Sequence, residues 1–179
     1  MSRAPEQFST ARLTARPPTR VDEEFLVATW SDPRVTEWLG GGRDRDAVRG
    51  LLAHFDDLWR HESYGVWLLS DRATEQPVGW VLLHPMDFGG HTGTEIGWAI
   101  VADRWREGLA SEAASHVVEI AFTTCRLDEI ISGTLPHNVA SRGVMEKLGF
   151  AYDREVEHAG LPHVLYRLDA ETWGQREHG

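Results

Sequence analysis

The sequence predicts an α/β fold of the α+β type, with a mixed, mostly antiparallel sheet of six or seven strands and about four helices. Three observations predict this class. The chain has 179 residues, of which 41% are hydrophobic, and this is enough to bury one sizeable core. Apolar residues recur at helical spacing in the first third, whereas short apolar runs between turn-forming residues fill the middle. No repeat, low-complexity tract or linker interrupts it, so we expect one domain over residues 1–179, with an ordered core at about 8–170.

The first third is expected to hold one strand and two helices. Alternation in "FSTARLTARPP" predicts a strand that ends at Pro17 and Pro18, because proline lacks the amide that sheet pairing needs. "VDEEFLVATWSD" predicts a short helix. "LGGGRDRD" predicts a flexible connector, since no buried strand precedes it and no Gly-Lys-Ser follows it. From Asp46 to His61 apolar residues fall every three or four positions, which predicts an amphipathic helix.

The middle of the chain predicts an antiparallel meander. "YGVWLLS" and "PVGWVLLH" flank the turn-rich "DRATEQ", which is typical of a hairpin. "HPMDFGGHTG" is expected to be a glycine-rich loop that leads into a third strand, "TEIGWAIV". A helix with an apolar stripe from Ala113 to Phe122 follows, then a strand at "DEIISGTL" and a helix at "NVASRGVMEKL". The final strands, "FAYDREVEH" and "LPHVLYRLD", are expected to form a hairpin around Ala159 and Gly160.

The charge balance argues against a nucleic-acid partner. Eighteen Lys and Arg residues against 28 Asp and Glu residues give a net charge of −10, which repels a phosphate backbone. Such a surface suits a cationic substrate, or simply keeps the protein soluble. No apolar run approaches the ~18 residues of a membrane span, and the N-terminal residues lack the apolar region of a signal peptide. We therefore expect no membrane partner and a cytoplasmic location.

The cysteine and histidine content points away from disulfides and metal sites. Cys125 is the only cysteine, so no disulfide framework can form, and we expect it to be a small core residue in a reducing compartment. The nine histidines form no His-Glu-x-x-His motif, and one cysteine cannot build a thiolate zinc site. We expect no metal.

The segment "DRWREGLASEA", from Asp103 to Ala113, joins a predicted strand to a predicted helix through a glycine-containing loop. Unpaired N–H groups and the helix dipole make such a junction a site for anions. Ala110 and Ser111 are small enough to let a diphosphate approach the backbone, and Arg104 and Arg106 can add positive charge. An ordinary strand-to-helix loop explains the same residues equally well.

A second segment, "TLPHNVASRGVMEKLGFAYDRE", combines a strand end, a capped helix and a sharp reversal. Asn138 is the predicted N-cap, and Gly149 is the predicted left-handed residue after the helix. Phe150 is expected to pack back on Met145. These features explain the fold, but they do not explain why Asn138 and Ser141 both face the strand end beside the first helix.

Together the two segments resemble the GNAT N-acetyltransferase superfamily, and within it the RimJ/RimL-like branch of ribosomal-protein-alanine N-acetyltransferases. The resemblance runs from "TARLTARPPTRVDEEFLVAT" through "EIGWAIVADRWREGLASEA" to "NVASRGVMEKLGF", with both central motifs in the expected order. It implies a sheet that splays where "EIGWAIV" meets "DEIISGTL", with acetyl-CoA as the co-substrate in that gap.

The resemblance also implies which residues bind the cofactor. The loop and the start of the next helix would bind the diphosphate through backbone amides, the strand end would pair with the pantetheine arm, and the second helix would approach from the other side. Glu107 departs from the usual loop and would have to point to solvent beside a diphosphate. The implied cofactor-binding residues are Ile100, Val101, Trp105, Arg106, Glu107, Gly108, Leu109, Ala110, Ser111, Asn138 and Arg142.

Acetyl transfer to an amine needs a base, because an alkyl amine with a pKa of about 8–10 is mostly charged at neutral pH. Glu95 is the candidate, since period-two geometry places it on the same face as Gly97 and Ala99, which leave room for a substrate. A solvent-facing strand glutamate is an equally good interpretation. His84 and His91, which flank the neighbouring loop, could share the role of base.

The leaving thiolate needs a different group. Many members of the superfamily carry a tyrosine at the position of Met145, which cannot donate a proton. Ser141, one helical turn earlier, matches the serine of the RimJ/RimL branch, and its hydroxyl can hydrogen-bond a thiolate whose pKa is ~8.5. A serine that satisfies a backbone amide in the first helical turn is the alternative.

The expected acceptor is a small-molecule amine or a protein N-terminus. Trp30 and Trp38, near the Gly40–Gly42 loop, and His84 are the candidate substrate-binding residues, because the segments 30–45 and 84–93 would surround the acceptor. A homodimer is one assembly open to such a chain. The function predicted is acetyl-CoA-dependent N-acetylation of a primary amine by direct attack in a ternary complex. The alternative is a non-enzymatic acyl-CoA-binding or sensing module whose catalytic groups have decayed, suggested by Met145 and Glu107.

Overall fold

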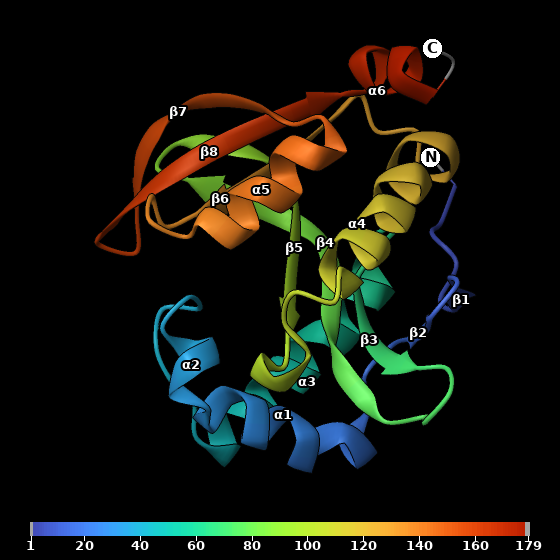
Figure 1. Ribbon diagram of the computed structural model, residues 1–179, viewed down its shortest axis with the longest axis vertical. Coiled ribbons are helices and arrows are strands. Elements are labelled where there is room, and N and C mark those ends of the chain that lie inside the picture. Colours follow the sequence, from blue (N-terminus) through green and yellow to red (C-terminus); the bar gives the residue numbers. More distant parts are fainter. Residues whose placement is uncertain (1, 178–179) are drawn as a thin grey trace.

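An eight-stranded sheet forms the centre of the computed structural model, which describes residues 2–177 (Figure 1). Across the sheet the strand order is β1-β2-β3-β4-β5-β6-β8-β7. The strands are β1 Phe8–Ser9, β2 Leu13–Arg16, β3 Val66–Asp71, β4 Pro77–Phe88, β5 His91–Ile100, β6 Glu129–Thr134, β7 Ala151–His158 and β8 Leu161–Asp169. Six α-helices lie within the described residues: α1 Glu23–Ser31, α2 Pro33–Thr36, α3 Arg45–His61, α4 Leu109–Glu119, α5 Val139–Leu148 and α6 Ala170–Glu177. Shorter helical turns are η1 Arg20–Asp22, η2 Ala102–Arg104 and η3 Ile120–Thr124, the last of them π-helical.

The predicted α+β class is confirmed, and the numbers of strands and helices exceed the prediction slightly. The predicted first strand is two short strands, because the chain turns between them, where the Thr10 amide donates to the Leu13 carbonyl at 2.9 Å. The four-residue helix α2 begins at Pro33, with the Asp32 side chain accepting from the Arg34 amide. The sequence pattern also did not predict α6, which follows β8 directly.

The sheet is split at its centre. β5 and β6 form a parallel pair with a single register position, Glu95 opposite Ile131. By contrast, β4 and β5 pair antiparallel over ten positions, from Gly79–Ile100 to Phe88–His91. The predicted splay between "EIGWAIV" and "DEIISGTL" is therefore confirmed. Beyond Glu95, the residues of β5 up to Ile100 do not pair with β6.

The predicted glycine-rich loop between the second and third strands of the meander is wrong. β4 continues to Phe88 and β5 begins at His91, so the turn holds only Gly89 and Gly90. Both glycines have positive φ, +61° and +90°, which a two-residue hairpin turn requires. The glycines therefore mark a tight turn in a long hairpin, and the strand pairing extends through residues such as Pro85 that lack strong strand preference.

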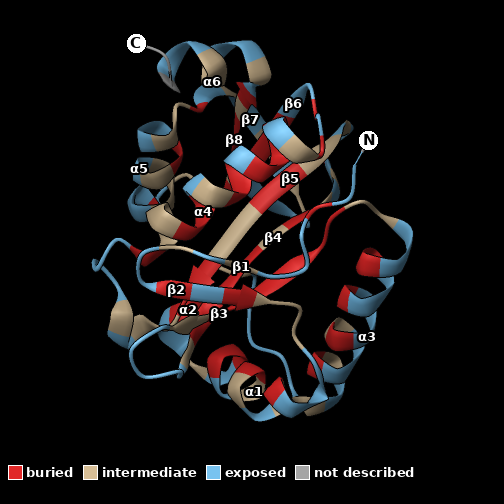
Figure 2. Ribbon diagram, turned by 90° about the vertical axis from the view of Figure 1, so that its right-hand side faces the viewer, coloured by how far each residue is buried: buried red, intermediate tan, exposed pale blue. Residues whose placement is uncertain are grey.

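Helices cover both faces of the sheet, and the buried residues gather beneath them (Figure 2). On one face, α4 packs on β4 and β5, and α5 packs on β6. On the other, α1 and α3 pack together over a second cluster that includes Trp80 and Ala99. Cys125 is fully buried, as predicted for a small core residue, and burial raises the pKa of its thiol. Within residues 2–177, no helix is long and apolar enough to cross a membrane.

The ends of α5 are fixed by the local signals that the sequence predicted. The Asn138 side chain accepts from the Ser141 amide at 3.1 Å and caps the first turn. Gly149 has φ +97°, and its amide donates to the Glu146 carbonyl, while the Phe150 amide donates to the Met145 carbonyl. These two bonds define a Schellman motif with Phe150 and Met145 buried beside it.

An ion pair between Arg16 and Asp22 holds the start of α1 against β2. Asp22 is 7% exposed, and its carboxylate accepts from both terminal guanidinium nitrogens of Arg16 at 2.7 and 2.8 Å and from the Thr19 amide at 2.7 Å. Burial acts to raise the pKa of Asp22, but the hydrogen bonds from Arg16 and Thr19 outweigh it, so the pKa lies below its ordinary value.

We expect Asp22→Asn to lower the free energy of unfolding by about 2 kcal/mol at neutral pH, because it leaves Arg16 without its anionic partner. A depressed carboxyl pKa adds stability above the ordinary value of 3.8 and loses it as the pH falls through the folded value. The difference between wild type and variant should therefore narrow only below about pH 3.8. Urea unfolding at neutral pH and below about pH 3.8 measures the difference in stability, with Asp57→Asn at an exposed position as the control. An unchanged stability at neutral pH would contradict the role of this pair.

Candidate active site

A cavity of about 710 Å³ lies where the split sheet meets the starts of α4 and α5. Trp98, Ala99 and Ile100 of β5 form one wall, and α2 with the residues after it closes the end. The remaining lining residues come from the loop before α4, from the first turn of α4, and from α5 with the residues just before it. The lining residues are Val35, Trp38, Leu39, Trp98, Ala99, Ile100, Arg104, Trp105, Arg106, Gly108, Leu109, Ala110, Ser111, His137, Asn138, Val139, Ala140, Ser141 and Val144.

The N-terminus of α4 opens into this cavity. Gly108 is the N-cap residue with φ +80°, and Arg106 two residues earlier also has a left-handed backbone, with φ +64°. No side chain of the described residues caps this helix. The first-turn N–H groups of Leu109, Ala110 and Ser111 therefore face a cavity that they line, which is the arrangement that binds an anionic group.

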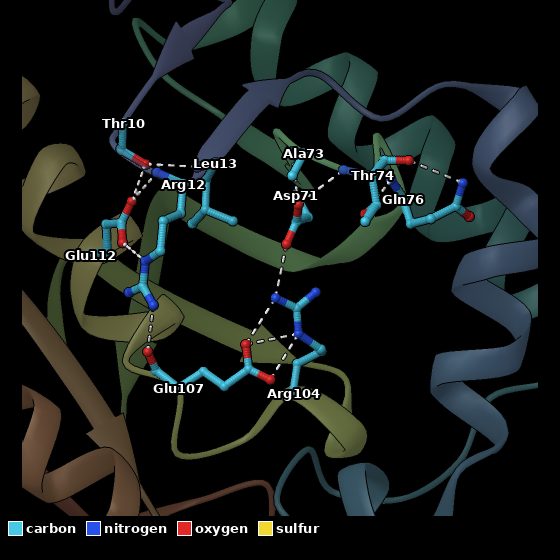
Figure 3. Close-up of polar contacts among 10 residues, drawn as sticks. All are labelled: Thr10, Arg12, Leu13, Asp71, Ala73, Thr74, Gln76, Arg104, Glu107 and Glu112. Carbon is cyan, nitrogen blue, oxygen red and sulfur yellow. Dashed lines mark hydrogen bonds and ion pairs between the residues drawn. The ribbon is translucent and has the colours of Figure 1, made fainter.

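The charged side chains around this loop are mostly paired with one another (Figure 3). Arg104 bonds the Glu107 carboxylate at 2.8 Å and Asp71 at 2.9 Å, so it is not free to add charge to the cavity as expected. Hydrogen bonds from Arg104 hold the pKa of both carboxyls below their ordinary values. Glu107, one of the predicted cofactor-binding residues, lines no part of the cavity, because its carboxylate is bonded to Arg104. Arg106 is exposed and supplies the cation that faces the cavity outside this network.

The open edge of β5 carries backbone groups toward the split. The Val101 amide donates to the Val78 carbonyl of β4 at 2.9 Å. Because backbone groups alternate in direction along a strand, the N–H and C=O groups of the even-numbered residues of β5 point toward β6. Two of their carbonyls are bound by side chains: Ile96 accepts from the Ser132 hydroxyl at 2.9 Å, and Ile100 accepts from the Trp105 indole at 2.7 Å. Between them, the backbone of Trp98 faces the gap. Val101 itself, a predicted cofactor residue, does not line the cavity.

The three predicted residues of the α5 segment have different surroundings. Asn138 is 7% exposed, and besides capping α5 its amide nitrogen donates to the Thr134 hydroxyl at 3.0 Å. Ser141 is half-buried and is one of the residues that line the cavity. Arg142 is held away from the cavity by bonds to the Tyr166 hydroxyl at 3.1 Å and the Pro136 carbonyl at 3.0 Å. Its predicted place beside the cofactor therefore finds no support in this geometry.

Glu95 lies at the point where β5 and β6 still meet. Its carboxylate is 2.7 Å from Nε2 of His84, the residue opposite it on β4, and Glu95 is 8% exposed. The alternative of a solvent-facing strand glutamate is therefore wrong. Glu95 shares its face with Gly97 and Ala99, and Ala99 belongs to the cluster beneath α1 and α3. The Glu95–His84 pair thus lies on the face of the sheet opposite α4 and α5.

The other residues predicted for the acceptor side lie in different places. Trp38 lines the cavity, and its ring lies 5.3 Å from that of His137. Trp30 is 8% exposed, stacks on Trp80 at 5.7 Å and lines no part of this cavity, because it belongs to the cluster on the opposite face of the sheet. His91 lies at the far end of β5, beyond the cavity.

Sequence reasoning missed several lining residues. His137 directly precedes the N-cap Asn138, so its place in "PHN" could have identified it. Val35 and Leu39 come from the chain around α2, whose position depends on tertiary packing. Among the described residues, no group of three or more His, Cys, Asp or Glu side chains could hold a metal ion.

The split sheet and the uncapped helix N-terminus beside its gap can accept an anionic ligand. Comparisons with known proteins give the class of the protein: an acyltransferase whose donor is acetyl-CoA. Residues 12–151 match the family described as Acetyltransferase (GNAT) domain, and the chain therefore belongs to the GNAT acetyltransferase family. The chain is an enzyme, which replaces the alternative of a non-enzymatic binding module.

Relatives and solved structures agree with this assignment. An uncharacterized N-acetyltransferase of Bacillus subtilis, YnaD, is 42% identical over 144 residues, which cover 79% of this chain and 81% of that protein. The crystal structure of an acetyltransferase from Agrobacterium tumefaciens is 25% identical and has a TM-score of 0.81, with 94% and 96% of the two chains covered. Mycobacterium smegmatis RimJ in complex with CoA-disulfide shares the fold at 18% identity, with a TM-score of 0.76 and coverage of 92% and 87%.

Proposed function

We propose that this protein transfers the acetyl group of acetyl-CoA to a primary amine by direct attack in a ternary complex. The observation that carries the proposal is the buried Glu95–His84 pair, which sits at the junction from which β5 and β6 diverge. The donor would enter from the α4 and α5 side, and the amine from the opposite face, so that the two meet at the split. The acceptor is a small-molecule amine or a protein N-terminus.

The donor site follows from the open helix end and the open strand edge. The diphosphate would lie at the amides of Gly108, Leu109, Ala110 and Ser111, with Arg106 adding charge. The pantetheine arm carries amides that can pair with the backbone of Trp98, in the way an added strand pairs with a sheet edge. Asn138 and Ser141 would approach from α5.

Glu95 would act as the base. A primary amine arrives mostly protonated, and it can attack the thioester only after losing a proton. The buried carboxylate can accept that proton, directly or through a water molecule, and His84 at 2.7 Å orients it. Gly97 and Ala99 lie on the same face as Glu95, and the Leu82 side chain packs over Gly97.

Ser141 would assist the departing thiolate. Met145, at the place where many family members carry a tyrosine, is 1% exposed and has no proton to give. Ser141 borders the cavity one turn earlier, and a hydroxyl donor there would stabilise the developing negative charge on sulfur. Trp38 and His137 would enclose the same end of the cavity.

An acceptor panel tests the proposed activity directly. Release of CoA is measured with acetyl-CoA and a set of primary amines that contains both N-terminal peptides and small alkyl amines. Turnover of at least one amine is the expected result. Tight CoA binding without turnover on any amine would contradict the proposal.

Gly108→Val should weaken CoA binding by about tenfold or more, because a β-branched residue resists a φ of +80° and so changes the backbone at the start of α4. The KM for acetyl-CoA should rise far more than that for the amine. Calorimetry with CoA measures the effect. Gly50→Val, in α3 where an added side chain meets open space, is the matched control. An unchanged CoA affinity would mean that this loop is only a structural junction.

Glu95→Gln should lower kcat about 100-fold while leaving CoA affinity intact, because it keeps the shape and removes the base. The loss should shrink at high pH, where more of the amine is already neutral. Steady-state rates over about pH 6 to 9 measure both effects, with Glu75→Gln in the exposed β3–β4 turn as control. Full kcat across this range would refute the assignment.

Ser141→Ala should lower kcat by about tenfold, and less for acyl donors whose thiol is more acidic, since those leave without help. A series of acetyl thioesters with different thiol pKa values measures this dependence. Ser115→Ala on the exposed side of α4 is the control. An equal loss for every thioester would assign Ser141 a structural role at the α5 N-terminus.

A further inference from the structure

The anion-binding end of α4 lies among three carboxylates, an unfavourable setting for a diphosphate unless their charge is compensated. Asp71 and Glu107 flank Arg104, and Glu112 stands in the first turn of α4 itself (Figure 3). The whole chain carries a net charge of −10. The side chains that compensate these carboxylates therefore bear on how the donor binds.

Arg12, in the turn between β1 and β2, contacts two separate parts of this end of the helix. Its Nε donates to Glu112 Oε2 at 2.6 Å, and its Nη1 donates to the Glu107 carbonyl at 2.8 Å. Glu112 also accepts from the Thr10 hydroxyl at 2.6 Å and from the Arg12 amide at 2.8 Å. The turn thus holds both the loop and the first turn of α4 from the side away from the cavity.

The bond to the Glu107 carbonyl fixes the direction of the next amide. In a planar trans peptide the C=O and the following N–H point in opposite directions. Arg12 lies outside the cavity lining and holds the carbonyl of Glu107, so the N–H of Gly108 points the other way, toward the cavity that Gly108 lines. Arg12 Nη2 would lie 3.6 Å from a Cβ placed on Gly108, which confirms how closely the guanidinium backs this residue.

Burial acts to raise the pKa of Glu112, but the hydrogen bonds from Thr10 and Arg12 outweigh it, so the pKa lies below its ordinary value. Glu112 is therefore an anion at neutral pH, and it forms an ion pair with Arg12 on the side away from the cavity. Arg104 does the same for Glu107 on the other side of the loop.

We propose that Arg12 is a positioning residue for the donor site: it aligns the Gly108 amide and neutralises Glu112, so that the end of α4 accepts the diphosphate of CoA. This inference rests on the proposed function, and in particular on the place of the diphosphate there. Arg12 acts through the loop and does not touch the donor.

The test compares two donors in the full-length enzyme. Acetyl-CoA carries the diphosphate, whereas acetyl-pantetheine lacks it and keeps the thioester and the arm. For Arg12→Ala we expect the calorimetric Kd for CoA and the KM for acetyl-CoA to rise about tenfold or more, with kcat at saturation within about twofold of wild type. The kcat/KM for acetyl-pantetheine should stay at the wild-type value.

Two further variants separate the role of the Arg12 side chain from a general effect on folding. Arg12→Lys retains the charge but lacks the fork that reaches Glu107 and Glu112 together, so it should fall between wild type and Arg12→Ala. It also serves if Arg12→Ala fails to fold, as judged by its thermal melt. Arg72→Ala is the matched control, since Arg72 bonds the Thr10 carbonyl of the same turn without touching the α4 loop. It should bind CoA as wild type does.

Equal losses with both donors would overturn the proposal, as would an unchanged Kd for CoA. Both outcomes would leave Arg12 as a structural contact of the N-terminal turn. Because the calorimetric arm needs no turnover, it distinguishes this failure from a failure of the proposed function. A wild-type protein that binds CoA without acetylating any amine contradicts the function alone, and the Arg12 comparison still stands on CoA affinity.

Discussion

The divergence of β5 from β6 is the constraint on which the active site depends. These strands share one register position, Glu95 with Ile131, and then separate. A sheet edge opened inside a protein exposes backbone donors and acceptors that need partners. Side chains satisfy the carbonyls of Ile96 and Ile100, and the remaining opening becomes a cavity bounded by the starts of two helices. The same divergence leaves Glu95 at the apex, buried and bonded to His84.

The second requirement is that the negative charges near the donor site are compensated, because an acidic protein has to bind a polyanionic donor. The helix end supplies oriented amides at no cost in net charge. Two arginines hold the nearby carboxylates. Arg104, in the loop itself, bridges Asp71 of β3 and Glu107, while Arg12, in the turn between β1 and β2, holds Glu112. The paired carboxylates line no part of the cavity, whereas Arg106 does.

Features with a local cause were predictable from the sequence. Both ends of α5, the N-cap Asn138 and the left-handed Gly149, follow from the backbone geometry of single residues. Features set by distant contacts were not: Trp30 and Trp38 stand eight positions apart in similar surroundings, yet one stacks on Trp80 in the core and the other borders the cavity. The Arg12–Glu112 pair joins residues 100 positions apart, which no local pattern encodes. The β4–β5 hairpin was mistaken for a loop because its glycines form only the turn.

The most direct test of the split as the donor site is residue-resolved amide hydrogen exchange with and without CoA. The arrangement predicts slower exchange on CoA binding at Trp98 and Ile100 of β5 and at the first turn of α4, with little change in the β3–β4 hairpin. The account would be contradicted if calorimetry verified CoA binding but the slowed amides lay elsewhere, for example around a smaller cavity lined by Arg20 and Arg49.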